Sequence, residues 1–129
     1  MQKEFVPAKE ALELKELGFD EPCFTYYKND QLSDILELVK NSEMENVNNE
    51  VNGYISAPTF SQAFRFFREK HNYYISVFRT HDGNWGVDLW LLGVHKPKAT
   101  VFGETYEEAE LACLIKLIQI VKDGKLKLI

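Results

Sequence analysis

Residues 73–92, YYISVFRTHDGNWGVDLWLL, decide the fold because they specify a β-hairpin. Two runs rich in aromatic and β-branched residues, 73–80 and 85–92, flank the segment His81-Asp82-Gly83-Asn84. Asp-Gly supplies the positive φ angles that tight hairpin turns need. The sequence therefore predicts two antiparallel strands joined by a short loop.

The two faces of this hairpin depend on the number of residues in its loop. Both loop lengths that we consider contain an even number of residues, and they produce the same two faces. One of these lengths places Arg79 opposite Asp88, a favourable cross-strand pair. The first predicted face carries Tyr74, Ser76, Phe78, Thr80, Trp85, Val87, Leu89 and Leu91. The second predicted face carries Tyr73, Ile75, Val77, Arg79, Gly86, Asp88, Trp90 and Leu92.

Both predicted faces are apolar at the end away from the turn. If helices cover the first face, the second needs another cover, which could be a loop or a further helix of the same chain. The alternative is an exposed patch that binds a second copy or another protein. Trp, Tyr and a neighbouring Arg are residue types that anchor interfaces. The residues concerned are Tyr73, Ile75, Val77, Trp90 and Leu92.

A helix is predicted immediately before the hairpin, from Thr59 to about residue 70. Thr59 and Gln62 fit a capping box at its start. Its core stripe repeats at helical spacing, and Phe66 lies off that stripe, between Arg65 and Arg68. The stripe consists of Phe60, Ala63, Phe64 and Phe67.

A longer helix is predicted after the hairpin, from Thr105 to about Lys122. Thr105 and Glu108 fit a second capping box, and Asp123-Gly124 is expected to stop the helix. Residues 125–129 then form a tail. The predicted core stripe consists of Ala109, Ala112, Cys113, Leu117, Ile120 and Val121, widened by Leu114 and Ile118.

The sequence of the first half of the chain defines its helices and strands less clearly. Residues 7–17 have helical spacing, and Gly18 suits the left-handed position after the helix end. Residues 31–38 fit either a helix or a short return strand, and we favour the strand. The remaining segments are strands at 23–28 and 51–56, a mobile loop at 40–50 and a short strand at 100–102. Together these elements predict one α+β domain over residues 1–129, with an antiparallel sheet of four or five strands and three helices packed mainly on one face.

Length, composition and charge exclude several classes of protein. The chain has 129 residues, 45% of them apolar, two cysteines and a formal net charge of −5. It is neither a disordered chain nor a disulfide scaffold, and it has no apolar run long enough to span a membrane. No apolar stretch follows its first ten residues, so we expect no signal peptide and a cytoplasmic location.

The charge is unevenly distributed along the chain. Residues 1–64 carry five Lys and no Arg against twelve acidic residues, which gives −7, while residues 65–129 carry ten basic and eight acidic residues, which gives +2. All three arginines, Arg65, Arg68 and Arg79, lie in the basic half. They either belong to a solvated surface or anchor an acidic partner or a phosphate.

No catalytic or metal-binding pattern is present in the sequence. The three histidines and two cysteines show no CxxC, HxH or HExxH spacing. Cys113 lies in a predicted core stripe, and no histidine is near Cys23 in sequence. We therefore expect no enzyme activity, no catalytic residue, no metal site and no cofactor.

Three segments of the chain are distinctive: ALELKELGFDEPC at 11–23, APTFSQAFRFFREK at 57–70 and ETYEEAELACLIKLIQIVK at 104–122. Together they resemble a family of small, uncharacterised proteins of phages and prophage-like elements of gut bacteria. The resemblance implies a phage-related protein in the cytoplasm of its host, and it carries no known activity.

Two hypotheses about function follow from these features. The first is a non-enzymatic accessory protein that acts through protein–protein contact or self-association. Its predicted binding residues are Arg65, Phe66, Arg68, Tyr73, Ile75, Arg79 and Trp90. The second is a factor that binds single-stranded nucleic acid through the basic region around Arg65, Arg68 and Arg79, with Trp or Tyr stacking on bases.

Overall fold

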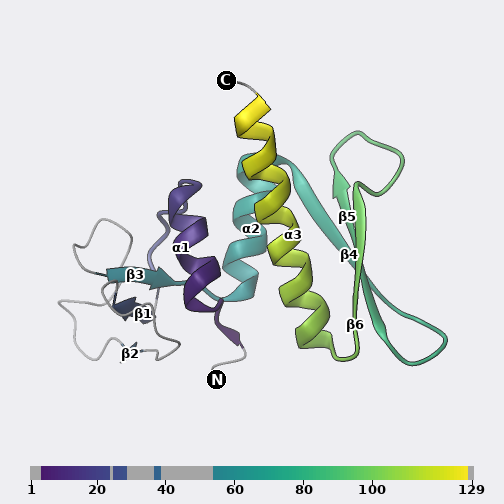
Figure 1. The fold of residues 1–129 in the computed structure, drawn as a ribbon, viewed down its shortest axis with the longest axis horizontal. Helices are drawn as coiled ribbons and strands as arrows, with labels where there is room; N and C mark the ends of the chain where they lie inside the picture. Colours follow the sequence, from purple (N-terminus) through teal and green to yellow (C-terminus); the bar gives the residue numbers. More distant parts are fainter. Residues whose placement is uncertain (1–3, 24, 29–36, 39–53, 128–129) are drawn as a thin grey trace. The chain divides into compact units, whose positions relative to one another are not determined.

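Over the residues that it describes, the computed structural model contains three helices and six strands (Figure 1). It describes residues 4–23, 25–28, 37–38 and 54–127. The described residues confirm the mixed α+β class. They fall into two compact units, residues 1–63 and 64–129, and the prediction of a single domain stays a prediction.

The strands form two separate antiparallel sheets, in the orders β2-β1-β3 and β4-β5-β6. The predicted single sheet of four or five strands is therefore wrong for the described residues. The physical reason is that β3 pairs with β1 and leads through Pro58 directly into a helix, so the hairpin forms a sheet with the strand that follows it.

The first unit consists of helix α1 (Ala8–Glu16), strands β1 (Thr25–Lys28), β2 (Glu37–Leu38) and β3 (Tyr54–Ala57), and the start of α2. Glu37–Leu38 pairs with β1 as the predicted return strand, whereas residues 31–36 and the predicted loop at 40–50 lie outside the described residues. Ile55 and Ala57 of β3 are buried together with the apolar face of α1.

Gly18 ends α1 in the predicted left-handed conformation, with φ of 101°. Its N–H donates to the carbonyl of Lys15 at 3.0 Å, and the N–H of Phe19 donates to that of Leu14 at 2.9 Å. These two bonds form a Schellman motif, and the buried side chains of Phe19 and Leu14 complete its apolar contact.

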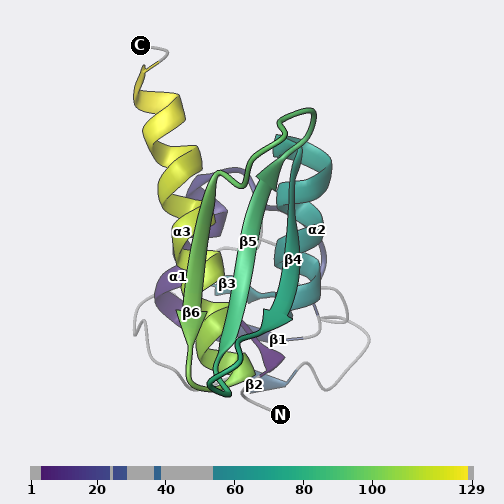
Figure 2. The ribbon, with the colours of Figure 1, turned by 90° about the vertical axis from the view of Figure 1, so that its right-hand side faces the viewer.

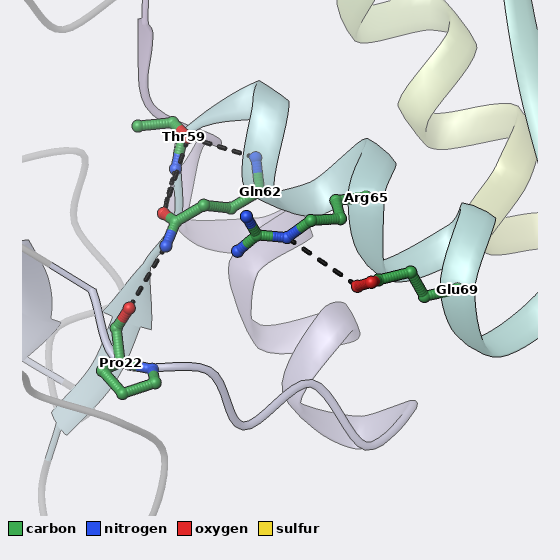
Figure 3. Close-up of polar contacts among 5 residues, drawn as sticks. All are labelled: Pro22, Thr59, Gln62, Arg65 and Glu69. Atoms are coloured by element: carbon green, nitrogen blue, oxygen red, sulfur yellow. Dashed lines mark hydrogen bonds and ion pairs between the residues drawn. The ribbon is translucent and has the colours of Figure 1, made fainter.

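Helix α2 (Phe60–His71) begins with the predicted capping box (Figure 3). The Gln62 N–H donates to Thr59 Oγ1 at 3.1 Å, and the Thr59 N–H donates to Gln62 Oε1 at 3.0 Å. Gln62 Nε2 also donates to the Pro22 carbonyl at 3.1 Å, which connects this helix start to the chain before β1. The helix ends at Asn72, which adopts the left-handed conformation with φ of 61°.

The second unit consists of the rest of α2, strands β4 (Tyr73–Arg79), β5 (Trp85–Leu91) and β6 (Ala99–Gly103), and helix α3 (Tyr106–Lys127). Helix α3 packs against β5 and β6, on one side of the sheet (Figures 1 and 2). The predicted core residues Ala109, Cys113 and Leu117 are buried, as are Leu114 and Ile118.

Both ends of α3 differ from the prediction. At the start, the Glu108 N–H donates to Thr105 Oγ1 at 3.1 Å as expected, but the Glu108 carboxylate accepts from the N–H of Glu104 rather than of Thr105, at 3.0 Å. At the other end the helix continues through Gly124 to Lys127, so the tail predicted from residue 125 is helical up to there. A helical glycine costs only about 1 kcal/mol relative to alanine, which the flanking residues can offset.

The hairpin loop holds an odd number of residues, and this overturns the predicted faces. Arg79 pairs with Trp85, which leaves Thr80–Asn84 as the loop. The Thr80 N–H donates to the Asn84 carbonyl at 2.9 Å, and Gly83 has φ of 92°. This is a three-residue turn with a glycine bulge, a common alternative to the even-numbered loops. The prediction of the two faces is therefore wrong: relative to β4, each residue of β5 lies on the face opposite to the predicted one. Asp88, for example, pairs with Ser76 instead of Arg79.

The capping box at Thr59 provides a test of the helix start. We expect Thr59→Ala to lower the free energy of unfolding by about 1 kcal/mol, because it leaves the Gln62 N–H without its acceptor. Chemical denaturation followed by circular dichroism measures the change, with exposed Ser61→Ala as the control that stays close to the natural protein. Equal stability of the two variants would contradict the role of the cap.

Gly86 provides a test of the sheet register. A Cβ at this position would collide with the ring of Phe78 on the facing strand. We therefore expect Gly86→Ala to destabilise the protein by about 1–3 kcal/mol in thermal or chemical unfolding. Gly124→Ala is the matched control, because that helical position is open and the same change should be neutral or mildly stabilising. A neutral Gly86→Ala would contradict the register.

Candidate functional site: the outer face of the second sheet

Figure 2 shows the face of the β4-β5-β6 sheet that lies away from α3. Among the described residues, this face carries the most distinctive group of side chains. We call it the outer face. The alternation of the three paired strands assigns to it Tyr74, Ser76, Phe78, Gly86, Asp88, Trp90, Thr100 and Phe102. The opposite, inner face carries Val87 and Leu89, which are buried, and Gly103, which lies against the backbone of α3.

Aromatic side chains occupy both ends of the outer face. Tyr74 and Trp90 are cross-strand partners, and their rings stack with centroids 6.2 Å apart and planes 10° from parallel. At the hairpin end, the rings of Phe78 and Phe102 meet edge to face with centroids 6.2 Å apart. Gly86 on β5 lies between Phe78 on β4 and Phe102 on β6, and the Phe78 ring packs over it. Aromatic pairs of this geometry contribute about 0.5–1.5 kcal/mol beyond their buried area.

A polar row separates the two aromatic clusters. Ser76, Asp88 and Thr100 are register partners across the three strands. The Thr100 hydroxyl donates to Asp88 Oδ1 at 2.6 Å, which holds the half-buried carboxylate in place. Because an ionised carboxylate accepts several hydrogen bonds, Asp88 retains capacity for a donor from outside the sheet.

The outer face remains accessible. Phe102 is 58% exposed and Tyr74 is 40% exposed, whereas Phe78 and Trp90 are partly covered by their ring partners. Phe102 and Tyr74 are two of the few large apolar side chains that the described part of the chain exposes. The two side chains lie on the same face, and aromatic side chains of this kind are enriched in protein interfaces.

The predicted binding residues do not assemble into one site. Tyr73, Ile75 and Arg79 lie on the inner face of β4, and only Trp90 belongs to the outer face. Phe66 is buried, and its ring contacts those of Phe67 and His71. Phe66 therefore offers little side-chain surface to a partner.

The three arginines lie on two different elements. Arg65 and Arg68 are exposed on α2, where Arg65 Nε lies 3.9 Å from Glu69 Oε1 (Figure 3). Arg79 lies at the end of β4, where its guanidinium carbon is 4.5 Å from the Trp85 ring centroid. Its Nη2 also donates to the Gly83 carbonyl at 2.9 Å, so Arg79 stabilises the hairpin end.

Sequence reasoning missed Tyr74, Phe78, Asp88, Thr100 and Phe102 as members of one surface. The hairpin faces were assigned with an even-numbered loop, which separated Tyr74 from Trp90 and Phe78 from Gly86. The signal that could have corrected this is Gly86 itself, because a glycine within a strand often marks a close approach by a neighbouring side chain.

The cysteine side chains are held in their unreactive, protonated form, and two of the three histidines lie in exposed loops. Cys23 and Cys113 are buried free thiols, and burial raises the pKa of each to about 12. His81 and His95 are exposed in loops. Within the described ranges, no group of three or more His, Cys, Asp or Glu side chains is placed to hold a metal ion, and no helix there is long and apolar enough to cross a membrane.

The raised thiol pKa values predict slow cysteine labelling. The thiolate is the reactive form, so at about pH 8 both buried thiols should stay protonated and react slowly with a disulfide reagent. The denaturant-unfolded chain should react fully at both cysteines. Because ionisation is easier in the unfolded chain, we also expect stability to fall as the pH rises from about 9 toward 12. Rapid labelling of either thiol in the folded protein would contradict this burial.

Comparisons with protein-family models, curated protein sequences and solved structures gave no match. The resemblance to small phage proteins therefore depends only on the three segments quoted above and stays a prediction. The outer face must be interpreted from its own geometry: an exposed, mainly aromatic surface with one oriented carboxylate at its centre.

Proposed function

We propose that the chain is a non-enzymatic accessory protein of a phage or mobile element and acts through protein–protein contact at the outer face. The observation that carries this proposal is the exposure of Phe102 and Tyr74 on the sheet face that contains Trp90 and Asp88. Tyr and Trp are the residue types most often found at the energetic centre of interfaces. Their rings are already held by ring partners, so binding would cost little side-chain entropy.

The side chains of the outer face indicate which groups a partner would present to it. The partner would present apolar side chains to the two aromatic clusters and a hydrogen-bond donor or cation to Asp88. The distance between Asp88 Oδ1 and the Thr100 hydroxyl is 2.6 Å, so the carboxylate is oriented before a partner binds. A buried charge contributes to binding only when it is paired, so Asp88 would select among apolar partners.

The nucleic-acid alternative has less support from the geometry. Arg79 is held by Trp85 and Gly83 of its own hairpin, and Arg65 lies beside Glu69. The charged residue at the centre of the outer face is an acid, which would repel phosphates.

A variant of the outer face tests this proposal. Proteins captured from host cells would be identified and purified, and the affinity of each for the natural chain would be measured by calorimetry. We expect Tyr74→Ser with Phe102→Ser to weaken binding at least about tenfold, because it removes exposed aromatic contacts. Both side chains are accessible in the folded chain, and a circular dichroism spectrum would confirm that the variant is folded.

The matched control is Val94→Ser with Ile115→Ser. These two side chains are also exposed, at 45% and 46%, but Val94 lies in the connection from β5 to β6 and Ile115 lies on α3. The control should bind like the natural chain. If both double variants bind the captured protein with unchanged affinity, the outer face is not the contact surface.

A further inference from the structure

The edge of the second sheet at β4 is a further surface that could pair with another chain. The strand order β4-β5-β6 places β4 at one edge of its sheet, and β5 is the only strand paired with it among the described residues. Natural edge strands are usually protected by lysines, prolines, bulges or shortness. The seven residues of β4, YYISVFR, contain no proline or glycine and a single charge, at Arg79. An edge of this kind is a template for another strand.

The hydrogen-bond pattern shows which backbone groups this edge offers. The Leu92 N–H donates to the Asn72 carbonyl at 2.9 Å, and at the other end the Thr80 N–H donates to the Asn84 carbonyl at 2.9 Å. Hydrogen-bonded pairs recur at every second residue of an antiparallel ladder, so the even-numbered residues of β4 bond to β5. The odd-numbered residues direct their N–H and C=O groups toward the free edge. They are Tyr73, Ile75, Val77 and Arg79.

We propose that β4 pairs with β4 of a second copy, antiparallel about a twofold axis, so that two three-stranded sheets join into one. Only one register pairs all seven residues: Ser76 lies opposite Ser76 of the second copy. This register also satisfies the hydrogen-bond pattern, because odd-numbered residues face odd-numbered residues across the axis. The proposal concerns the edge of the sheet and does not rest on the proposed function.

The side chains are self-complementary in this register. Tyr73 faces Arg79 of the second copy, so the only charge of each strand meets an aromatic ring rather than a like charge. Ile75 faces Val77, and Tyr74 faces Phe78. Val77 is 39% exposed, and the second copy would cover it. Because the axis is perpendicular to the sheet, the two outer faces would lie on the same side.

A cysteine at position 76 tests the register directly. Residues opposite each other in a non-hydrogen-bonded pair have Cα atoms about 4.5 Å apart, which lies within the range of a disulfide. We expect Ser76→Cys to form a covalent dimer on mild oxidation, seen on a non-reducing gel. The control is Ser61→Cys, exposed at the start of α2, which should form far less. Equal cross-linking of the two variants would overturn the proposed register.

Sedimentation over a range of concentrations tests the edge itself. We expect the natural chain to dimerise and Val77→Pro to weaken the dimer at least about tenfold, because proline removes an N–H that points to the free edge and has no acceptor among the described residues. Val77→Thr keeps that N–H and should dimerise. If Val77→Pro fails to fold, Val77→Lys takes its place, since a lysine would face Ile75 at the interface. A natural chain that stays monomeric, or a dimer that these variants leave intact, would overturn the proposal.

Discussion

The number of residues in the β4–β5 loop is the constraint on which the second unit depends. Five residues separate Arg79 from Trp85, and Gly83 closes the turn in a left-handed conformation. Side chains alternate along a strand, so one residue more or fewer in this loop would exchange the faces of β5 relative to β4. The observed length places Val87 and Leu89 toward α3 and Asp88 and Trp90 on the outer face.

The composition of the outer face follows from this register. Phe78 lies opposite Gly86, so its ring can fold over the glycine and meet Phe102 on the next strand. Trp90 lies opposite Tyr74, and the two rings stack. A glycine within a strand would ordinarily weaken a sheet, and the ring above Gly86 restores the missing packing. The surface proposed for protein contact is thus also part of what holds the sheet together.

Local features of the fold could be predicted from the sequence. Strand pairing and register, which depend on the number of residues between strands, could not. The helix starts at Thr59 and Thr105 and the end at Gly18 were predicted because a cap is determined by a few neighbouring residues. The division into two sheets was missed because strand pairing depends on distant partners. The outer face was missed because Asp82-Gly83 fits loops of both even and odd length.

Hα–Hα contacts across the hairpin, observed by NMR, test the central claim most directly. In the non-hydrogen-bonded pairs of an antiparallel ladder the Hα atoms of facing residues lie close together. The register described here predicts strong cross-peaks from Val77 to Val87 and from Ile75 to Leu89. It also predicts Gly86 Hα resonances shifted by the ring of Phe78. A cross-peak from Val77 to Asp88 in their place would indicate an even-numbered loop and would contradict both the register and the outer face.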